Sequence, residues 1–213
     1  MNMIRWMKAR VSPRLVAVPL ALGVLGLAAC GSSTNTTSST TASAEPTTTS
    51  TSTTQSALIG KHTSLALNPA NSKLLAENGI TVTAVAPATY SKTLVLPVDG
   101  GQVAVATVKG TINHTGGVKL SHGEKSITVT SFIVDTSTEQ VTALIGGQRV
   151  PVFAINPSAE KHETEAGGVI VDQGLQLTLT EPAADALNSA LGVTAFKSGQ
   201  VFATATMTLA VKT

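Results

Sequence analysis

Alternation of apolar and polar residues dominates the C-terminal part of the chain. The clearest runs are 175–179, where three leucines alternate with Gln and Thr, and 201–211, where one face carries Val, Ala, Met and Leu. A period of two residues is typical of a strand with one buried face. Both runs are therefore predicted to be half-buried β-strands.

Weaker strand patterns occupy much of the sequence between residues 80 and 155. They cover 80–85, 93–98, 103–113, 117–121, 126–134, 140–145 and 149–155. Predicted hairpin turns lie between them, at Asp99-Gly100-Gly101, Thr115-Gly116-Gly117, His122-Gly123-Glu124 and Gly146-Gly147-Gln148. Glycine adopts the positive φ angles that tight turns need. Many short strands joined in this way predict an all-β fold, an antiparallel sandwich or barrel.

Two short helices are expected to interrupt the strands. Asn68 before Pro69 is a typical helix start, and Gly79 is placed to end that helix. The second predicted helix starts at Glu181-Pro182 and ends at Gly192. Both helices are predicted to cover the ends of the β core.

The first thirty residues have the layout of a bacterial lipoprotein signal peptide. A basic leader up to Arg14 precedes the uncharged, mostly apolar segment 15–27. This segment is shorter than the ~20 residues that a membrane-spanning helix needs. Leu27-Ala28-Ala29-Cys30 resembles the lipobox, which implies cleavage before Cys30 and acylation of its thiol. An ordinary secretory signal with a coincidental cysteine is the alternative.

Three segments follow from these patterns: a signal peptide at 1–29, a tether at 30–56 and a single β-rich domain at 57–213. The tether is rich in Ser and Thr and contains no large aliphatic side chain. Such a segment buries too little apolar surface to offset its chain entropy, so it is expected to be disordered. The mature protein is expected on the extracytoplasmic side of the cell membrane, held there by its lipid.

Cleavage changes the charge balance. The leader contains four of the 14 basic residues and none of the 12 acidic ones, so the mature chain has ten basic residues and is slightly acidic. These ten are scattered singly, whereas binding to phosphates needs clustered Lys and Arg. Nucleic acid is therefore excluded as a partner. Because Cys30 is the only cysteine, disulfides and thiolate metal sites are also excluded.

His114 and His122 are the first candidate ligand residues, because each falls on the apolar face of a predicted strand. If Thr115-Gly116-Gly117 is a hairpin turn, His122 lies opposite Gly110. The two histidines are then ~13 Å apart at ~3.3 Å per residue, too far to share a metal ion.

A second group, His162, Glu163 and Glu165, lies in the polar stretch 158–168. Imidazole and carboxylate groups can bind a divalent metal, but a solvated loop is the simpler interpretation. No metal site is predicted.

Catalytic motifs are absent from the sequence. It has no Gly-Xaa-Ser-Xaa-Gly nucleophile elbow, and its glycines do not form a phosphate-binding loop. Paired carboxylates of the kind that a glycosidase uses remain open among the twelve acidic residues. The mature chain has no Trp and only Tyr90, so stacking of sugars on aromatic rings is not expected.

Part of the chain resembles the HtaA-type domain, a family of actinobacterial cell-surface β domains. The resemblance is carried by 110–120, 127–135, 141–145 and 177–187 and extends over about Asn68 to Thr208. Some members bind haem through a tyrosine backed by a histidine, which implies Tyr90 as the ligand together with His114 or His122. Gly117 stands where haem-binding members have a histidine.

The leading hypothesis is a membrane-anchored surface lipoprotein with a non-catalytic binding or structural β domain, without a cofactor and with an unidentified envelope or extracellular ligand. A carrier of haem or of a small apolar ligand, using Tyr90 with His114 or His122, is the first alternative. An envelope hydrolase is the second.

Replacement of Cys30 tests the anchor. Because acyl chains add roughly 0.8 kcal/mol of membrane affinity per buried CH₂, Cys30→Ser should move the protein from the membrane fraction to the soluble fraction. Ser32→Ala, in the same tether, should leave the distribution unchanged. Retention of the processed Cys30→Ser protein in the membrane would contradict the lipobox interpretation.

Overall fold

The computed structural model describes residues 54–212, and the elements below belong to that part of the chain. The strands and helices, in chain order, are β1 (Gln55–Leu67), α1 (Pro69–Glu77), β2 (Thr81–Val85), β3 (Thr89–Tyr90), β4 (Thr93–Ala104), β5 (Lys109–His114), β6 (Gly117–His122), β7 (Lys125–Asp135), β8 (Gln140–Ile145), β9 (Gln148–Asn156), β10 (Lys161–Glu165), β11 (Val169–Leu179), α2 (Glu181–Leu191) and β12 (Val201–Val211).

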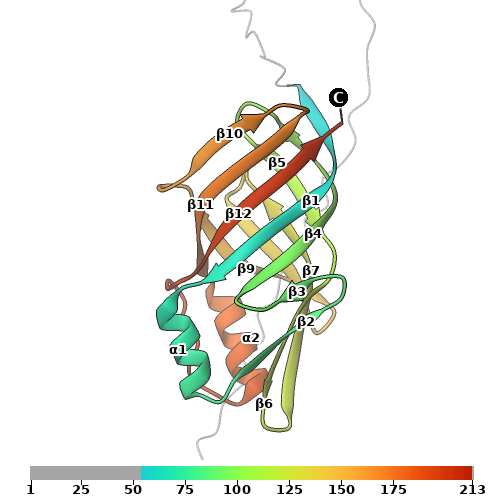
Figure 1. Cartoon of the computed structure of the whole chain (residues 1–213). Helices are drawn as coiled ribbons and strands as arrows, with labels where there is room; N and C mark the ends of the chain where they lie inside the picture. The colour runs from blue at the N-terminus through green and yellow to red at the C-terminus, as the bar shows by residue number, and fades with distance from the viewer. Residues whose placement is uncertain (1–53, 213) are drawn as a thin grey trace, which may run out of the picture. The chain divides into compact units, whose positions relative to one another are not determined.

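Eight strands form a closed antiparallel barrel (Figure 1). Their order is β7-β5-β4-β1-β12-β11-β9-β8, and pairing of β8 with β7 completes the ring. This closure confirms the predicted all-β antiparallel fold and decides between its two forms, since a sandwich has open sheet edges and a barrel has none.

The strand β7 carries two partners on one edge. Its first half pairs with β6 and its last residues pair with β5, so β5 and β6 lie end to end along it. The change of partner occurs at Ser131, which has a φ of 52° and whose N–H donates to the carbonyl of Gly116. The predicted hairpin at Thr115-Gly116-Gly117 is therefore wrong. Alternation predicted β6 at 117–121, but the predicted strand at 103–113 is wrong, because a turn at 105–108 divides it into the end of β4 and β5. Alternation also does not report which strand pairs with which.

The predicted turn at Asp99-Gly100-Gly101 is also wrong. The strand β4 continues through it, with a bulge in its pairing with β5 between Val98 and Gly100. A Cβ at Gly101 would overlap the carbonyl of Thr111, so glycine here permits a close approach of two strands. The turns predicted at Gly123 and at Gly146-Gly147 are confirmed as the β6–β7 and β8–β9 hairpins.

Three strands lie where none was predicted. The strand β1 begins at Gln55, so Gln55 and Ser56, assigned to the tether by sequence, are its first two residues. Its alternation is broken by a bulge at Gly60, yet it pairs along both edges, with β4 and with β12, and so forms part of the barrel wall. The second is β10, which forms in the predicted polar loop and pairs with β11. The third is β3, a strand of two residues that pairs with β4.

Both predicted helices are present, and they lie at one end of the barrel (Figure 1). The Asn68 side chain caps α1 by accepting from the Ala70 N–H. Asn71 ties α1 to the barrel through its Nδ2, which donates to the carbonyls of Val201 and Phe202 at 2.8 and 3.0 Å. Gly192 ends α2 in a left-handed conformation with a φ of 68°.

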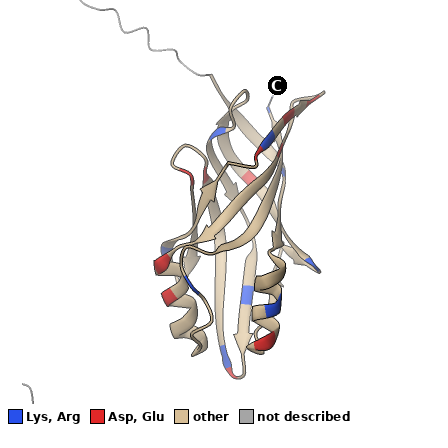
Figure 2. Ribbon diagram, turned by 90° about the vertical axis from the view of Figure 1, so that its left-hand side faces the viewer, with Lys and Arg blue, Asp and Glu red and all other residues tan. Residues whose placement is uncertain are grey.

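Figure 2 shows the Lys and Arg residues of the described chain spread over separate helices, strands and loops. Within residues 54–212, no helix is long and apolar enough to cross a membrane.

Candidate functional site

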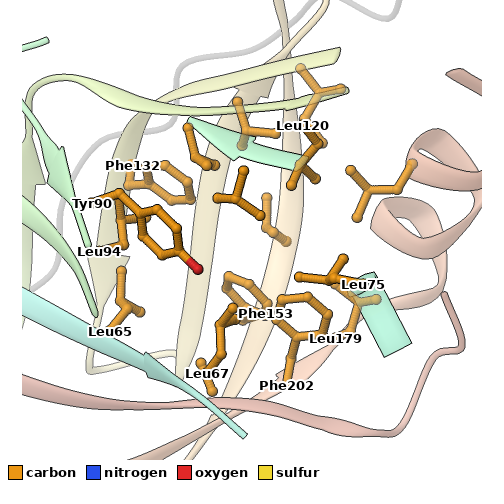
Figure 3. A pocket seen from close by; sticks show the side chains of 17 residues that line it. Leu65, Leu67, Leu75, Tyr90, Leu94, Leu120, Phe132, Phe153, Leu179 and Phe202 are labelled. Atoms are coloured by element: carbon orange, nitrogen blue, oxygen red, sulfur yellow. The ribbon is translucent and has the colours of Figure 1, made fainter. Parts of the chain in front are cut away.

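An apolar pocket lies inside the barrel at the helix end, with a volume of about 80 Å³ (Figure 3). We call it the apolar pocket. Its lining side chains come from both helices and from strands all around the barrel: Leu65, Leu67, Leu75, Val82, Tyr90, Leu94, Val118, Leu120, Val129, Phe132, Ile145, Val152, Phe153, Leu179, Leu187, Phe202 and Ala203. Most are the inward-facing residues of alternating strands, so the pattern that folds the barrel also makes this pocket apolar.

Tyr90 is the only lining residue with a polar side-chain atom. It lies on the two-residue strand β3, which pairs with β4 so that Tyr90 is opposite Leu94. In Figure 3 its ring stands at the side of the pocket, with the hydroxyl directed toward Phe153 and the other lining side chains. The surface that the pocket presents to a ligand is nevertheless entirely apolar, so Tyr90 contributes its ring to the wall and not its hydroxyl.

One side of the apolar pocket is less deeply buried than the rest. Leu179 is 2% exposed, whereas seven lining residues are half-buried: Leu65, Leu67, Val82, Tyr90, Leu94, Val118 and Phe202. Four of them belong to the strands where β6 and β2 diverge from the barrel and β3 folds against β4, and the other three lie on β1 and β12. We expect a ligand to enter along these strands.

Aromatic rings form the floor between the helices and the sheet. The rings of Phe153 and Phe202 are stacked with centroids 5.9 Å apart, and Phe196 lies 6.2 Å from Phe202. Phe132 lines the pocket above them. Such contacts hold the rings in place, so this wall is preformed.

His114 lies in the neighbouring part of the core and does not line the apolar pocket. It is 4% exposed and borders a second cavity of about 20 Å³, separated from the first by Leu65, Phe132 and Phe153. Its Nδ1 is 3.3 Å from the Phe132 carbonyl, which can only accept, so Nδ1 carries the proton. Its Nε2, 2.7 Å from Thr63 Oγ1, then accepts from the Thr63 hydroxyl.

Both ring nitrogens of His114 are thus satisfied in the neutral form. Burial lowers the pKa of His114 from 6.5 to about 4, because the charged ring would lose its hydration. The Phe132 carbonyl and the charge of Asp99 act in the opposite direction but do not outweigh burial. His114 is a structural core residue in this conformation.

His122 is in a third location. Its Nδ1 lies 3.0 Å from the carbonyl of Leu191, the last residue of α2. A helix leaves its last carbonyls without partners within the helix, so His122 caps α2. The three predicted ligand residues therefore have different surroundings, and only Tyr90 lines the apolar pocket.

His162, Glu163 and Glu165 are exposed on β10. No group of three or more His, Cys, Asp or Glu side chains in residues 54–212 is arranged to hold a metal ion. Cys30 lies outside the described residues.

Sequence reasoning missed Asp172, which is 1% exposed and lies at the far end of β11 from α2. Burial, and to a lesser extent the charge and hydrogen bonding of Glu160, raise the pKa of Asp172 to about 7. The sequence could have indicated this burial, because Asp172 lies between Ile170 and Leu175 in a strand whose alternate residues are apolar. A carboxylate on such a face is rarely buried without a partner.

Comparison with known proteins supports the fold. The C-terminal domain of HtaA from Corynebacterium glutamicum is 11% identical over 74% of this chain and 99% of that domain, with a TM-score of 0.57. HtaB from the same organism, described as a heme binding protein, is 12% identical over 75% of this chain and 96% of its own, with a TM-score of 0.45. No family model and no curated protein matches the chain. This protein therefore has an HtaA-like fold.

The buried imidazole predicts loss of stability in acid. The pKa of His114 is lower in the folded protein than the ordinary 6.5 of the unfolded chain. The unfolded state therefore binds the proton first. The contribution of His114 to stability should be complete above about pH 6.5 and fall as the pH decreases toward 4, by on the order of 3 kcal/mol in total. The raised pKa of Asp172 adds stability as the pH falls over the same range, so the His114 contribution is measured as a difference between variants.

Denaturant unfolding of the wild type, His114→Gln and His62→Gln between pH 7.5 and 4 measures this contribution. His62 is exposed on β1, so His62→Gln should have the pH profile of the wild type. His114→Gln should be less stable than the wild type at pH 7.5, and this difference should shrink or reverse toward pH 4, because the variant lacks the buried imidazole. Parallel pH profiles for all three proteins would contradict the assignment of a neutral, buried His114.

Proposed function

We propose that this protein is a non-catalytic binding protein on the extracytoplasmic face of the membrane, and that the apolar pocket holds a small apolar ligand. The observation that carries this proposal is the wall of the pocket, which presents only apolar surface. A cavity with this wall favours a ligand through burial of apolar surface. Tyr90 contributes its ring to this wall.

The size of the pocket limits the ligand. Its volume of about 80 Å³ is smaller than the cavity of about 150 Å³ that holds benzene in an engineered core. The ligand is therefore a molecule of a few heavy atoms or the end of an acyl chain whose remainder lies at the entrance. Half-buried Val82, Leu94 and Val118 would contact that remainder.

A binding role fits the chemistry of the pocket better than catalysis does. Its lining includes no His, Asp, Glu, Lys, Cys or Ser side chain, and general acid–base or nucleophilic catalysis requires such groups. His114, the nearest candidate base in the core, is already bonded through both nitrogens. The envelope hydrolase alternative has no group to support it in this pocket.

Anchoring through Cys30 completes the proposal. The lipobox sequence supports export and acylation, and the Ser/Thr-rich segment after Cys30 would separate the binding domain from the lipid surface. The ligand would then be taken from the cell envelope or from the medium.

A fluorescent acyl chain, cis-parinaric acid, tests the apolar pocket in the purified full-length protein, because one end of such a chain can enter the pocket while the remainder lies at the entrance. Val82→Phe places a larger side chain on the half-buried side of the pocket and should weaken probe binding at least tenfold. Val150→Phe makes the same change at a half-buried residue outside the pocket and should bind as the wild type does. Equal loss in both variants, or no binding by the wild type, would contradict the proposal.

Haem is the second candidate ligand, because Tyr90 supplies a phenol oxygen of the kind that ligates ferric iron. The pocket is much smaller than the roughly 300–1,000 Å³ of typical ligand and cofactor sites, and His114 is not beside Tyr90 in its wall. In this conformation the pocket thus has neither the space for haem nor an exposed phenol oxygen in its wall. Haem binding would require the helices and β2–β3 to move away from the barrel.

Addition of hemin distinguishes the two candidates. Haem ligation through Tyr90 predicts a shifted Soret band in the wild type that is lost in Tyr90→Phe, which keeps the ring. His122→Gln should retain the shift, since His122 contacts α2 and not the pocket. No shift with the wild type would exclude haem and leave the smaller apolar ligand.

A further inference from the structure

A polar pocket, different from the two cavities described above, lies between β9 and β10 and beside the β4–β5 and β7–β8 turns, and it has a volume of about 90 Å³. We call it the polar pocket. Its lining residues are Thr107, Val108, Lys109, Thr136, Glu139, Ile155, Pro157, Glu160, Asp172 and Leu175. No residue is shared with the apolar pocket. The two pockets are therefore separate sites.

Asp172 is the most unusual residue of the polar pocket. It is 1% exposed, and its Oδ1 is buried without a hydrogen-bond partner. The alternation of β11 directs it inward, as it does Ile170. An unpaired buried acceptor costs roughly 1–3 kcal/mol, and more when it is charged. A carboxylate at this buried position is explained if its oxygen binds a ligand.

Glu160 is brought beside Asp172 by the segment between β9 and β10. These two strands follow the same edge of β11, and residues 157–160 form a turn between them, with the Glu160 N–H donating to the Pro157 carbonyl at 2.9 Å. The turn rests on Gly174, which has a φ of 82°, and a Cβ there would overlap the carbonyl of Ala159. Glycine at 174 thus permits the approach of Glu160.

The charges of the polar pocket are not balanced. Three carboxylates line it, at Glu139, Glu160 and Asp172, against a single ammonium, that of Lys109. Lys109 is engaged elsewhere, since its Nζ donates to the Thr136 carbonyl at 2.8 Å and lies 3.6 Å from Glu139 Oε1. Within the pocket lining, no cation remains for Asp172 and Glu160.

We propose that the polar pocket binds a partly hydrated divalent cation, with the carboxylates of Asp172 and Glu160 as its protein ligands. Hard cations such as Ca²⁺ and Mg²⁺ take oxygen ligands, and Mg²⁺ commonly binds through one or two carboxylates and several waters. The volume of about 90 Å³ holds an ion with a few waters, at about 30 Å³ per water in the liquid.

Two carboxylates are fewer than a fully protein-lined metal site uses, which agrees with the lack of any set of three His, Cys, Asp or Glu ligands in residues 54–212. The affinity should therefore be that of a weak extracellular site, with a Kd on the order of 10⁻⁴–10⁻³ M. A bound cation would join the 157–160 turn to β11 and close this end of the barrel.

Calorimetric titration of the chelator-treated full-length protein with CaCl₂ and, separately, MgCl₂ tests the site. We expect one equivalent of at least one of the two ions to bind and to raise the Tm. Asp172→Asn removes the buried charge with little change of shape and should weaken binding at least tenfold. Glu160→Gln should do the same, and it covers the case in which Asp172→Asn does not fold.

Glu165→Gln is the matched control, because Glu165 is an exposed carboxylate on β10 outside the polar pocket. It should bind the cation as the wild type does, and NaCl at equal ionic strength should not raise the Tm. Absence of binding by the wild type, or an equal loss in all three variants, would overturn the proposal. Binding of cis-parinaric acid to the same samples reports on the apolar pocket independently.

Discussion

Closure of the barrel through β7 and β8 is the constraint on which the rest of the structure depends. The pairing of these strands joins the two ends of the strand order and leaves an interior that side chains must fill. An eight-stranded barrel has an interior just large enough to be filled or to hold one small ligand. With four Phe and one Tyr in the whole chain, the interior is filled mainly by Val, Leu, Ile and Ala, and cavities remain.

The same constraint explains why the two ends of the barrel differ. At the helix end, β7 exchanges β5 for β6, and β6 carries β2 away from the barrel, so the helices and Tyr90 cover the opening. At the other end, β11 exchanges β9 for β10, and the intervening turn brings Glu160 to Asp172. Each proposed site is thus located where one long strand changes partner.

His114 shows how a residue can look functional in sequence and be structural in the fold. It lies on an apolar strand face, as predicted, but Thr63 and the Phe132 carbonyl satisfy both of its nitrogens. Tyr90 is the reverse case, since no motif surrounds it, yet the short strand β3 places it in the wall of the apolar pocket. An HtaA-like fold therefore does not by itself supply a tyrosine–histidine pair, and function must be argued from the residues present.

The sequence by itself determined the local features: the alternating strands, the two capped helices and the turns at Gly123 and Gly146. These depend on residues close together in the chain, such as Asn68 with Ala70. Only the tertiary structure decided that β5 and β6 both pair with β7, and that β1 pairs with β4 and β12. It also decided that Asp172 and Glu160 line the same pocket. The reason is that alternation reports which face of a strand is buried, whereas strand partners are selected by packing between segments distant in sequence.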